Sequence, residues 1–285
     1  MQPTDQIVEN ILTHNEAPLA EFLGLTAKKL FYLLYEPFTD SSPVRLRTDI
    51  DDETLDRIPL FRIAEEYLKI IQRDKFIKLT PLGALPKKVM VELYEHHFLL
   101  DEYIESGLIK LWKEEDCISI LSMKIAIGTT GLLKKLHNKL SLTKKGEKLL
   151  KVENRSQLFH AFFHAFTQNF NWGFNDGFTD QPIGQLGWAY SVLMLAKFGN
   201  QEQTVDAYAD RYLNVFPNSL SLFSASYTSP KNHFSHCFGV RTFERFLYWF
   251  GFVTVSRHGI YMNHDKDKFV ATDLISSVFI FEETK

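Results

Sequence analysis

The chain has 285 residues, of which 45% are hydrophobic and 24% are charged, and its formal net charge at pH 7 is -3. This composition is typical of a globular protein with enough apolar material for two or three subdomains. The slight negative charge excludes the strongly basic character of a protein that coats nucleic acid, although a local basic patch is compatible with it. The 25 Phe and 11 Tyr gather in the second half of the sequence, which predicts helices packed through aromatic side chains there.

The cysteines and the hydropathy pattern bear on the location of the protein. Cys117 and Cys237 are far apart and form no CxxC pair, so neither a disulfide framework nor a cysteine zinc site is indicated. The first residues lack the basic and then apolar pattern of a secretion signal, and no apolar stretch is long enough to span a bilayer. We therefore expect a cytoplasmic protein that does not contact a membrane.

Residues 1–50 are expected to form an N-terminal helical arm. One short helix is predicted over 5–14 and a second over 18–35, which ends before Pro37 because the residue preceding a proline is disfavoured in the helical region. The polar segment 39–52 predicts a loop that joins the arm to the rest of the chain. Two roles are compatible with this arm, namely dimerisation or docking, and simple packing on the rest of the chain.

Residues 51–153 are expected to form a winged-helix-like domain. Apolar residues recur at i, i+3 and i+4 from Leu60 to Ile71, which predicts a helix with one buried face. The further elements predicted here are a strand over 76–79, a helix over 86–98, a strand or helix over 108–112, an amphipathic helix over 117–127 and a turn over 128–131.

The stretch LLKKLHNKLSLTKKGEKLLK, residues 132–151, has the most distinctive pattern of this domain. Alternating Leu140 and Leu142 predict a short half-buried strand, and Thr143 predicts the N-cap of a following helix. The leucines ahead of them have helical spacing and predict a helix over 131–137. The resulting order of helix, strand and capped helix is that of one edge of a winged helix-turn-helix.

Two other segments echo this pattern. Ile77 and Leu79 alternate ahead of Thr80 and Gly83, and a weaker echo closes the chain over 241–275. Two close copies and one degenerate copy predict a duplicated unit, while their uneven spacing argues against a solenoid.

The segments IKLTPLGALPKKVMVELYE, LSLTKKGEKLL and RTFERFLYWFGFVTV carry a resemblance to a known group. The chain resembles, from about residue 55 to its end, uncharacterised bacterial proteins that carry LTxxG motifs, including regions seen beside plasmid pRiA4b ORF-3-like domains. This resemblance implies winged-helix-like structure, and it supplies no catalytic residues that could be carried over to this sequence.

Residues 154–217 are expected to form an aromatic helical region with helices over 155–170, 184–198 and 201–215. The loop 169–182 is dense in Asn, Gly and Asp and contains several aromatic residues. Polar turn residues placed among rings that favour burial make this loop a candidate for a specific site.

Residues 218–285 are expected to form a C-terminal winged-helix-like unit. A helix is predicted over 239–250, followed by a strand and a hairpin whose tip carries His258-Gly259. The predicted fold class is therefore mainly α, with winged-helix-like units and short β-hairpins around an aromatic-rich helical layer.

A cluster of lysines is the first candidate binding surface. It could neutralise several nucleic-acid phosphates, and each such contact steepens the salt dependence of binding by about one unit. Lysines position a nucleic acid but do not read its sequence, and no helix rich in Arg, Asn and Gln of the kind that reads bases is evident. A solvated face used for protein contacts is the alternative. The candidate residues are Lys134, Lys135, Lys139, Lys144, Lys145 and Lys148.

His160 and His164 are four residues apart on a predicted helix, which is a spacing that lets two imidazoles share a metal ion. Asp176 or Asp180 could complete such a site. The pattern lacks the glutamate of HExxH, and ordinary hydrogen-bonded or exposed histidines are the alternative.

A second group of polar residues, His233, His236 and Cys237, precedes the last predicted helix. With a fourth ligand it could hold zinc, and His236 with Cys237 could act as base and nucleophile, but no orienting third residue is evident. Neither GxGxxG nor GxxxxGK[ST] occurs, so no cofactor is expected.

The sequence therefore favours a non-enzymatic interaction module of winged-helix type, with DNA, RNA or a protein as its partner. The alternative is a metal-dependent hydrolase with its site near His160, His164, Asp176 and Asp180.

Overall fold

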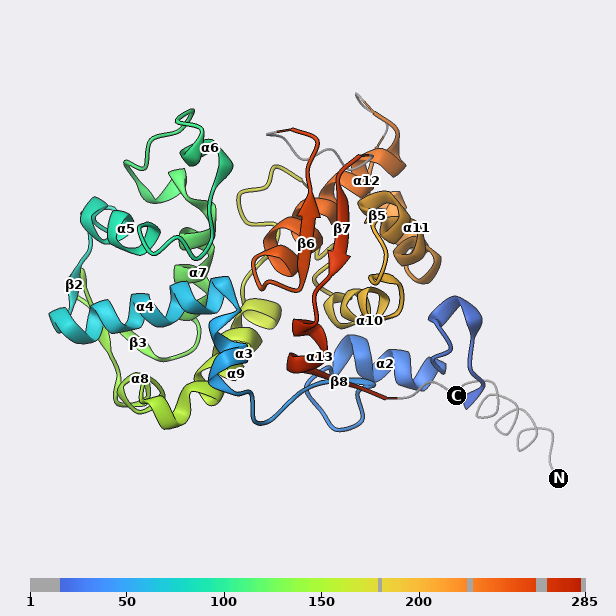
Figure 1. Ribbon diagram of the computed structural model, residues 1–285, viewed down its shortest axis with the longest axis horizontal. Coiled ribbons are helices and arrows are strands. Elements are labelled where there is room, and N and C mark those ends of the chain that lie inside the picture. Colours follow the sequence, from blue (N-terminus) through green and yellow to red (C-terminus); the bar gives the residue numbers. More distant parts are fainter. Residues whose placement is uncertain (1–15, 179–180, 225–227, 260–265, 283–285) are drawn as a thin grey trace.

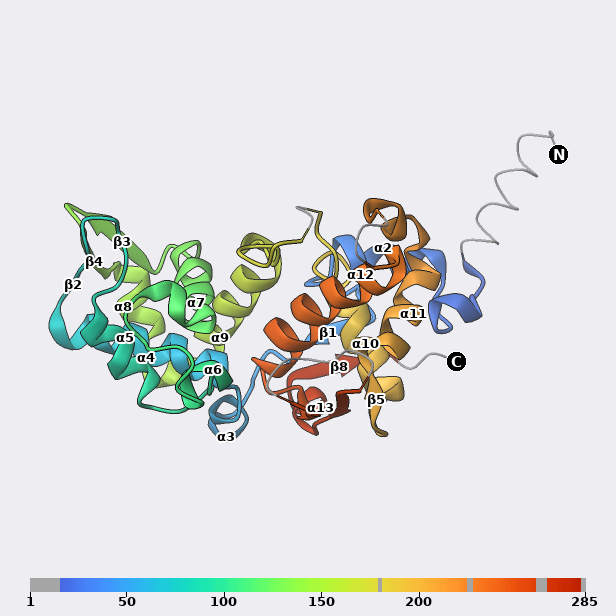
Figure 2. The same ribbon diagram turned by 90° about the horizontal axis from the view of Figure 1, so that it is seen from above.

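The computed structural model describes residues 16–178, 181–224, 228–259 and 266–282. Figure 1 shows two lobes, and the view from above in Figure 2 separates the same two groups of elements. The elements from α4 to α8 form one lobe, and the elements from α10 onward form the other together with the N-terminal α2. The protein is mainly helical, as the sequence predicts, and the strands of the described residues form small antiparallel sheets.

The first lobe is built around one three-stranded sheet covered by helices. Its strands are ordered β2-β4-β3, so β2, the first of the three in sequence, lies beside β4, the last of the three. The helix α4 begins with a proline at its first position, where the missing amide hydrogen costs nothing. The elements in chain order are α4 (Pro59–Asp74), β2 (Ile77–Lys78), α5 (Lys87–Tyr94), α6 (Glu102–Glu105), η2 (Glu114–Asp116), α7 (Ile118–Gly128), β3 (Leu133–Leu136), β4 (Lys139–Leu142) and α8 (Lys144–Leu149).

The helix predicted over 131–137 is wrong, because this segment is the strand β3. It forms a hairpin with β4 in which Leu133 lies opposite Leu142. The two connecting residues, His137 and Asn138, have positive φ angles of 49° and 57°. Two consecutive residues of this kind make the tight turn whose twist matches that of a two-stranded hairpin. The turn therefore overrides the helical spacing of the leucines.

The two close sequence echoes are not two copies of one unit. Ile77 of β2 lies directly opposite Leu140 of β4, so both segments are strands of the same sheet. Their similarity reflects the shared need for alternating buried residues on neighbouring strands. The segment 108–112, predicted as strand or helix, is neither.

The second lobe repeats the order of elements of the first. A helix and a strand are followed by several helical segments and a hairpin, and the strands are ordered β5-β7-β6, so the first strand of this sheet again lies beside the last. The predicted boundary between residues 217 and 218 falls inside this unit. The elements are α10 (Trp188–Phe198), β5 (Gln203–Thr204), α11 (Val205–Val215), η5 (Pro217–Leu222), α12 (Pro230–Phe238), its π-helical continuation η6 (Gly239–Tyr248), β6 (Val253–Ser256) and β7 (Lys268–Ala271).

The two ends of the described chain meet in the second lobe. The strand β1 (Val44–Leu46) pairs antiparallel with β8 (Phe279–Phe281), which follows α13 (Leu274–Val278). The helix predicted over 18–35 is interrupted by Leu23 and Gly24 at positive φ, which leaves η1 (Ala20–Phe22) and α2 (Ala27–Tyr35). The helix predicted over 5–14 lies outside the described residues.

The helix α9 (Arg155–His164) and its π-helical extension η4 (Ala165–Asn169) connect the lobes. Its buried Phe163 contacts the rings of Trp188, Phe246 and Phe279 in the second lobe. Its first turn is fastened to α3 (Asp52–Asp56) and α4 in the first lobe. The aromatic helical layer predicted from the abundance of Phe is therefore a continuous core. None of the helices in the described part of the chain is long and apolar enough to cross a membrane.

Candidate functional site

The hairpin lysines are divided between the two faces of the first sheet. Buried Leu140 and Leu142 define the inner face of β4, and the strand register places Lys134 and Lys139 on the opposite, outer face. Lys78 of β2 lies beside Lys139 on this outer face. All three lysine side chains are exposed. We call the outer surface formed by Phe76, Lys78, Lys134, Leu136 and Lys139 the basic face.

Two large apolar side chains are exposed on the basic face. Phe76, just before β2, is 39% exposed, and Leu136 at the end of β3 is 66% exposed. The Lys139 ammonium lies 4.3 Å from the centroid of the Phe76 ring, which is a cation–π contact. The strands of this sheet contain no acidic residue. The basic face therefore combines uncompensated positive charge with an accessible aromatic ring.

Lys135 does not belong to the basic face. It lies opposite buried Leu140, so its side chain leaves the sheet on the inner side. There its ammonium approaches Gly83, at 3.2 Å from the position that a Cβ atom on this glycine would occupy. Gly83 has a φ of +83° and belongs to the turn after β2.

The other candidate lysines, Lys144, Lys145 and Lys148, are exposed on α8. The Thr143 hydroxyl accepts a hydrogen bond from the Gly146 amide at 3.1 Å, which confirms the predicted N-cap. The Lys145 ammonium donates to the Thr130 carbonyl oxygen at 2.9 Å and is thereby held against the turn before β3. The six predicted lysines, all exposed, thus occupy three places, namely the basic face, the inner side of the sheet near Gly83, and α8.

The two Thr-x-x-Gly segments have different structures. Thr143 caps a helix, and a Cβ atom on Gly146 would overlap the backbone carbonyl oxygen of Leu132, so this position needs a glycine for close packing. Thr80 instead begins a turn, in which its hydroxyl accepts from the Ala84 amide at 3.0 Å. The same sequence motif therefore forms a close helix–strand contact at Thr143–Gly146 and a turn of the chain at Thr80–Gly83.

The helix that precedes each hairpin is packed inside the protein. In α7, residues such as Ser122 and Met123 are fully buried, and in η6 the same holds for Thr242 and Phe246. A recognition helix must present a row of exposed side chains to a DNA groove. Neither helix does so over most of its length, so any nucleic-acid contact of these units falls to other elements.

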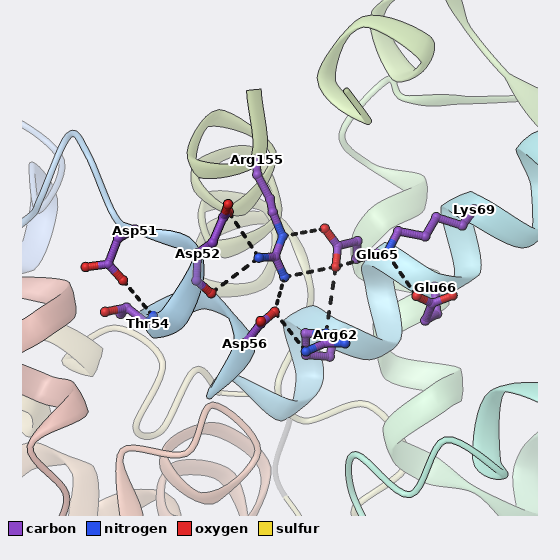
Figure 3. Close-up of polar contacts among 9 residues, drawn as sticks. All are labelled: Asp51, Asp52, Thr54, Asp56, Arg62, Glu65, Glu66, Lys69 and Arg155. Carbon is purple, nitrogen blue, oxygen red and sulfur yellow. Dashed lines mark hydrogen bonds and ion pairs between the residues drawn. The ribbon is translucent and has the colours of Figure 1, made fainter. Parts of the chain in front are cut away.

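A network of charged side chains lies where α9 leaves the first lobe (Figure 3). Arg155 at the start of α9 donates to Glu65 of α4 at 2.6 Å, to Asp52 at 3.1 Å and to Asp56 at 2.5 Å. Arg62 adds a second bond to Asp56 at 2.8 Å. One guanidinium thus joins three carboxylates from two helices.

The charged network joins the start of α9 to α3 and α4. Glu65 is buried, and Lys69 lies 3.4 Å from it on the side away from Arg155. The hydrogen bond from Arg155 lowers the pKa of the Asp56 carboxyl, so this group stays ionised at neutral pH. Asp51 caps α3 by accepting from the Thr54 amide at 2.7 Å. Each of these carboxylates has a partner within the protein, which fixes the direction in which α9 enters the second lobe.

The residues of the predicted metal site have separate roles. His160 Nε2 lies 2.8 Å from the Arg47 carbonyl oxygen, and the exposed His164 ring packs against Phe38 with 4.8 Å between centroids. Both histidines line a pocket of about 370 Å³ between α9 and the β1–β8 sheet. Asp180 lies outside the described residues. Within the described ranges, no group of three or more His, Cys, Asp or Glu side chains is placed to hold a metal ion.

Asp176 forms a fully buried ion pair with Arg241 of η6. The Arg241 Nε lies 2.5 Å from one carboxylate oxygen, and a terminal nitrogen lies 3.3 Å from the other. The second terminal nitrogen donates to the Gln181 carbonyl oxygen at 2.6 Å. This pair occupies one of the two carboxylates considered for the metal site, and it joins the polar loop 169–182 to the second lobe.

The other polar residues of that loop satisfy backbone groups. The Gln185 amide nitrogen donates to the Phe170 carbonyl oxygen at 2.7 Å, and its oxygen accepts from the Trp172 amide at 3.1 Å. The Trp172 ring nitrogen donates to the Phe166 carbonyl oxygen at 2.9 Å. The described part of this loop is therefore held by internal hydrogen bonds around a buried tryptophan.

The predicted His/Cys group lies on α12. Cys237 is fully buried, and burial raises the pKa of its thiol to about 12, which disfavours the thiolate that a nucleophile or zinc ligand requires. The His233 ring contacts Phe223 and Phe178. These residues act as part of the aromatic packing of the second lobe.

Residues 56–157 match the family described as the Y4jL N-terminal domain. The matched range runs from the end of α3 to the first turn of α9, and it contains the whole first unit, the basic face and Arg155. The chain matches none of the curated proteins and none of the solved structures with which it was compared.

Proposed function

We propose that the chain is a tandem winged-helix protein that binds nucleic acid through the phosphate backbone. The contacts are made by the basic face of the first unit and by the lysines of α8. The binding is independent of sequence and involves no catalysis. The cytoplasmic location expected from the sequence belongs to the same proposal.

The winged-helix part of the proposal is supported by the order of elements. Both units run from a helix to a strand, then through several helical segments to a hairpin, and in both sheets the first strand lies beside the last. This is the order of a winged-helix domain. The hairpin β3–β4 would then be the wing of the first unit.

One observation supports the proposal of nucleic-acid binding most strongly. The strand register places Lys78, Lys134 and Lys139 together on the outer face of the first sheet, and the strands of this sheet contain no acidic residue. Phosphate contacts by lysine give affinity that falls steeply with salt. The burial of α7 and η6 removes the helices that would read bases, which is the reason for proposing sequence-independent binding. The exposed Phe76 ring offers a surface on which an unpaired base can stack.

The proposal is tested by fluorescence-anisotropy titration with a mixed-sequence DNA duplex and with single-stranded RNA at several salt concentrations. We expect binding that weakens with salt. Replacing Lys134 and Lys139 together by Gln should reduce the log–log salt slope for the duplex by about 2, since each lost phosphate contact removes about 0.9. The matched control replaces exposed Lys28 and Lys266 by Gln, which removes the same charge elsewhere.

The outcomes separate the parts of the proposal. If neither nucleic acid binds at low salt, the proposal fails and the lysines are a solvated surface or a protein-contact face. If the Lys28/Lys266 control weakens binding as much as the Lys134/Lys139 variant, the basic face is not the binding surface. Phe76→Ala should weaken single-stranded binding by about 1–3 kcal/mol if a base stacks there, and should leave duplex binding unchanged.

A further inference from the structure

A pocket of about 370 Å³ lies between α9 and the two-stranded sheet β1–β8 in the second lobe, apart from the basic face. Its size falls within the range of small-molecule sites. The lining joins one arginine, two histidines and an acidic residue to an apolar wall. The residues that matter here are Phe38, Asp40, Arg45, His160, His164 and Ile280.

Arg45 distinguishes this pocket from the rest of the protein. The chain has ten arginines. Nine of them donate a hydrogen bond within the structure, for example Arg155 to Glu65 and Arg241 to Asp176. Arg45 is half-buried on β1, and its guanidinium has no hydrogen bond or ion pair with any of the described residues. A guanidinium removed from part of its water without a partner is the arrangement expected of a site whose counter-charge comes from a ligand.

The histidines add donors and acceptors on the opposite wall. The partner of His160 Nε2 is the Arg47 carbonyl oxygen, which can only accept, so the proton of the neutral ring is on Nε2 and Nδ1 is left for another contact. His164 packs its ring on Phe38, which leaves its nitrogen atoms without a partner among the described residues. No ion pair joins Asp40 to Arg45 within the described residues, so the one carboxylate of the lining does not neutralise the guanidinium.

The remaining wall is apolar. Phe38 is 37% exposed and is held in place by Trp188, with 5.6 Å between ring centroids, while Ile280 lies directly opposite Arg45 in the strand pairing and is also 37% exposed. We propose that this pocket binds a small organic anion, whose carboxylate or phosphate group pairs with Arg45 while its apolar body lies against Phe38 and Ile280.

The test uses four probes with the full chain, namely benzoate, phenyl phosphate, inorganic phosphate and benzyl alcohol. Binding is followed by calorimetry and by the ring proton resonances of the histidines. We expect saturable binding of benzoate or phenyl phosphate, with shifts at His160 and His164. Inorganic phosphate should bind more weakly because it lacks the apolar body, and benzyl alcohol should bind more weakly because it lacks the charge. The preferred probe of the first two identifies the anionic group.

Two variants localise the site. Arg45→Gln should weaken the binding of the preferred probe at least tenfold, while the control Arg57→Gln, which removes the same charge from an exposed ion pair with Asp273, should leave it unchanged. Ile280→Trp keeps every charge and fills the pocket, so it should abolish binding while circular dichroism stays that of the native protein. The proposal is overturned if neither benzoate nor phenyl phosphate saturates, or if Arg45→Gln binds them as the native protein does.

Discussion

The buried ion pair between Asp176 and Arg241 should dominate the stability of the second lobe. Replacing Asp176 by Asn keeps the shape of the side chain but removes the carboxylate that pairs with Arg241 in a fully buried position. Removing one partner of a buried pair costs about 3–5 kcal/mol, because the remaining charge cannot be hydrated. The hydrogen bonds from this guanidinium to both Asp176 carboxylate oxygens and to the Gln181 carbonyl oxygen place Asp176→Asn in that range.

The assay is urea unfolding followed by tryptophan fluorescence, with Trp172 in the same loop as a local reporter. The double variant Asp176→Asn/Arg241→Met removes both charges and should be less destabilised than the sum of the single variants, which measures the coupling. The control is Asp210→Asn, which breaks an exposed pair with Lys231 and should cost less than about 1 kcal/mol.

The reasoning is refuted if Asp176→Asn lowers the free energy of unfolding by less than about 1 kcal/mol, because breaking a buried ion pair is expected to cost more than this. A metal chelator provides a separate check on the alternative role of Asp176. Chelation should leave the unfolding curve unchanged if the carboxylate serves Arg241, and a large chelator-dependent shift would restore the metal-site hypothesis.

Three further perturbations have expected outcomes. Gly146→Ala should destabilise the first unit by about 1–3 kcal/mol, because the new Cβ overlaps the Leu132 carbonyl oxygen, whereas Gly128→Ala meets no atom and should not; thermal unfolding of the two variants compares them. Arg155→Gln should lower the free energy of unfolding by about 1–3 kcal/mol, because three carboxylates then lie together without the guanidinium that joins them. A smaller decrease in urea unfolding would show that the network does not stabilise the fold. Burial raises the pKa of the Glu244 carboxyl from 4.5 to about 7, so between these pH values the folded state binds this proton more tightly than the unfolded state, and the free energy of unfolding falls as the pH rises. The variant Glu244→Gln should lessen this fall in urea midpoints measured from pH 4.5 to 8. An unchanged dependence of the midpoint on pH would refute the assignment.

The sequence predicts local structure well where one residue type decides it. The Thr143 cap, the helix with the apolar periodicity from Leu60 to Ile71 and the aromatic packing of α9 all follow from short-range patterns. The hairpin β3–β4 was missed because three leucines fit helical spacing, while the decisive signal was the dipeptide His137-Asn138, whose residue types tolerate positive φ.

Long-range pairing could not be predicted. The strands β1, β5 and β8 have two or three residues each, too few for a periodicity to be recognised, and their partners lie far away in the sequence. The two similar Thr-x-x-Gly segments were therefore interpreted as repeats, although they flank neighbouring strands of one sheet.

The candidate sites also depend on contacts between residues that are far apart in the sequence. The lysine cluster is visible in the sequence, but its division between two faces depends on the hairpin register, and Phe76 and Lys78 join it only through β2. The spacing of His160 and His164 correctly placed both on one helix. Arg45 became a candidate only because the structure leaves it unpaired, and no sequence pattern marks such a residue.

The pairing of β1 with β8 has a consequence for synthesis on the ribosome. The first unit is a continuous stretch and can fold as soon as it has emerged, but Leu46 must wait for Phe279, roughly 230 residues later. At about 5–20 residues per second this delay is on the order of 10–50 s. Until α10 has been made, α2, with its apolar Leu30 and Leu33, lacks the surface that covers it in the finished protein. The segment from α2 to β1 is thus made early and buried late, and it is where a chaperone would be needed most.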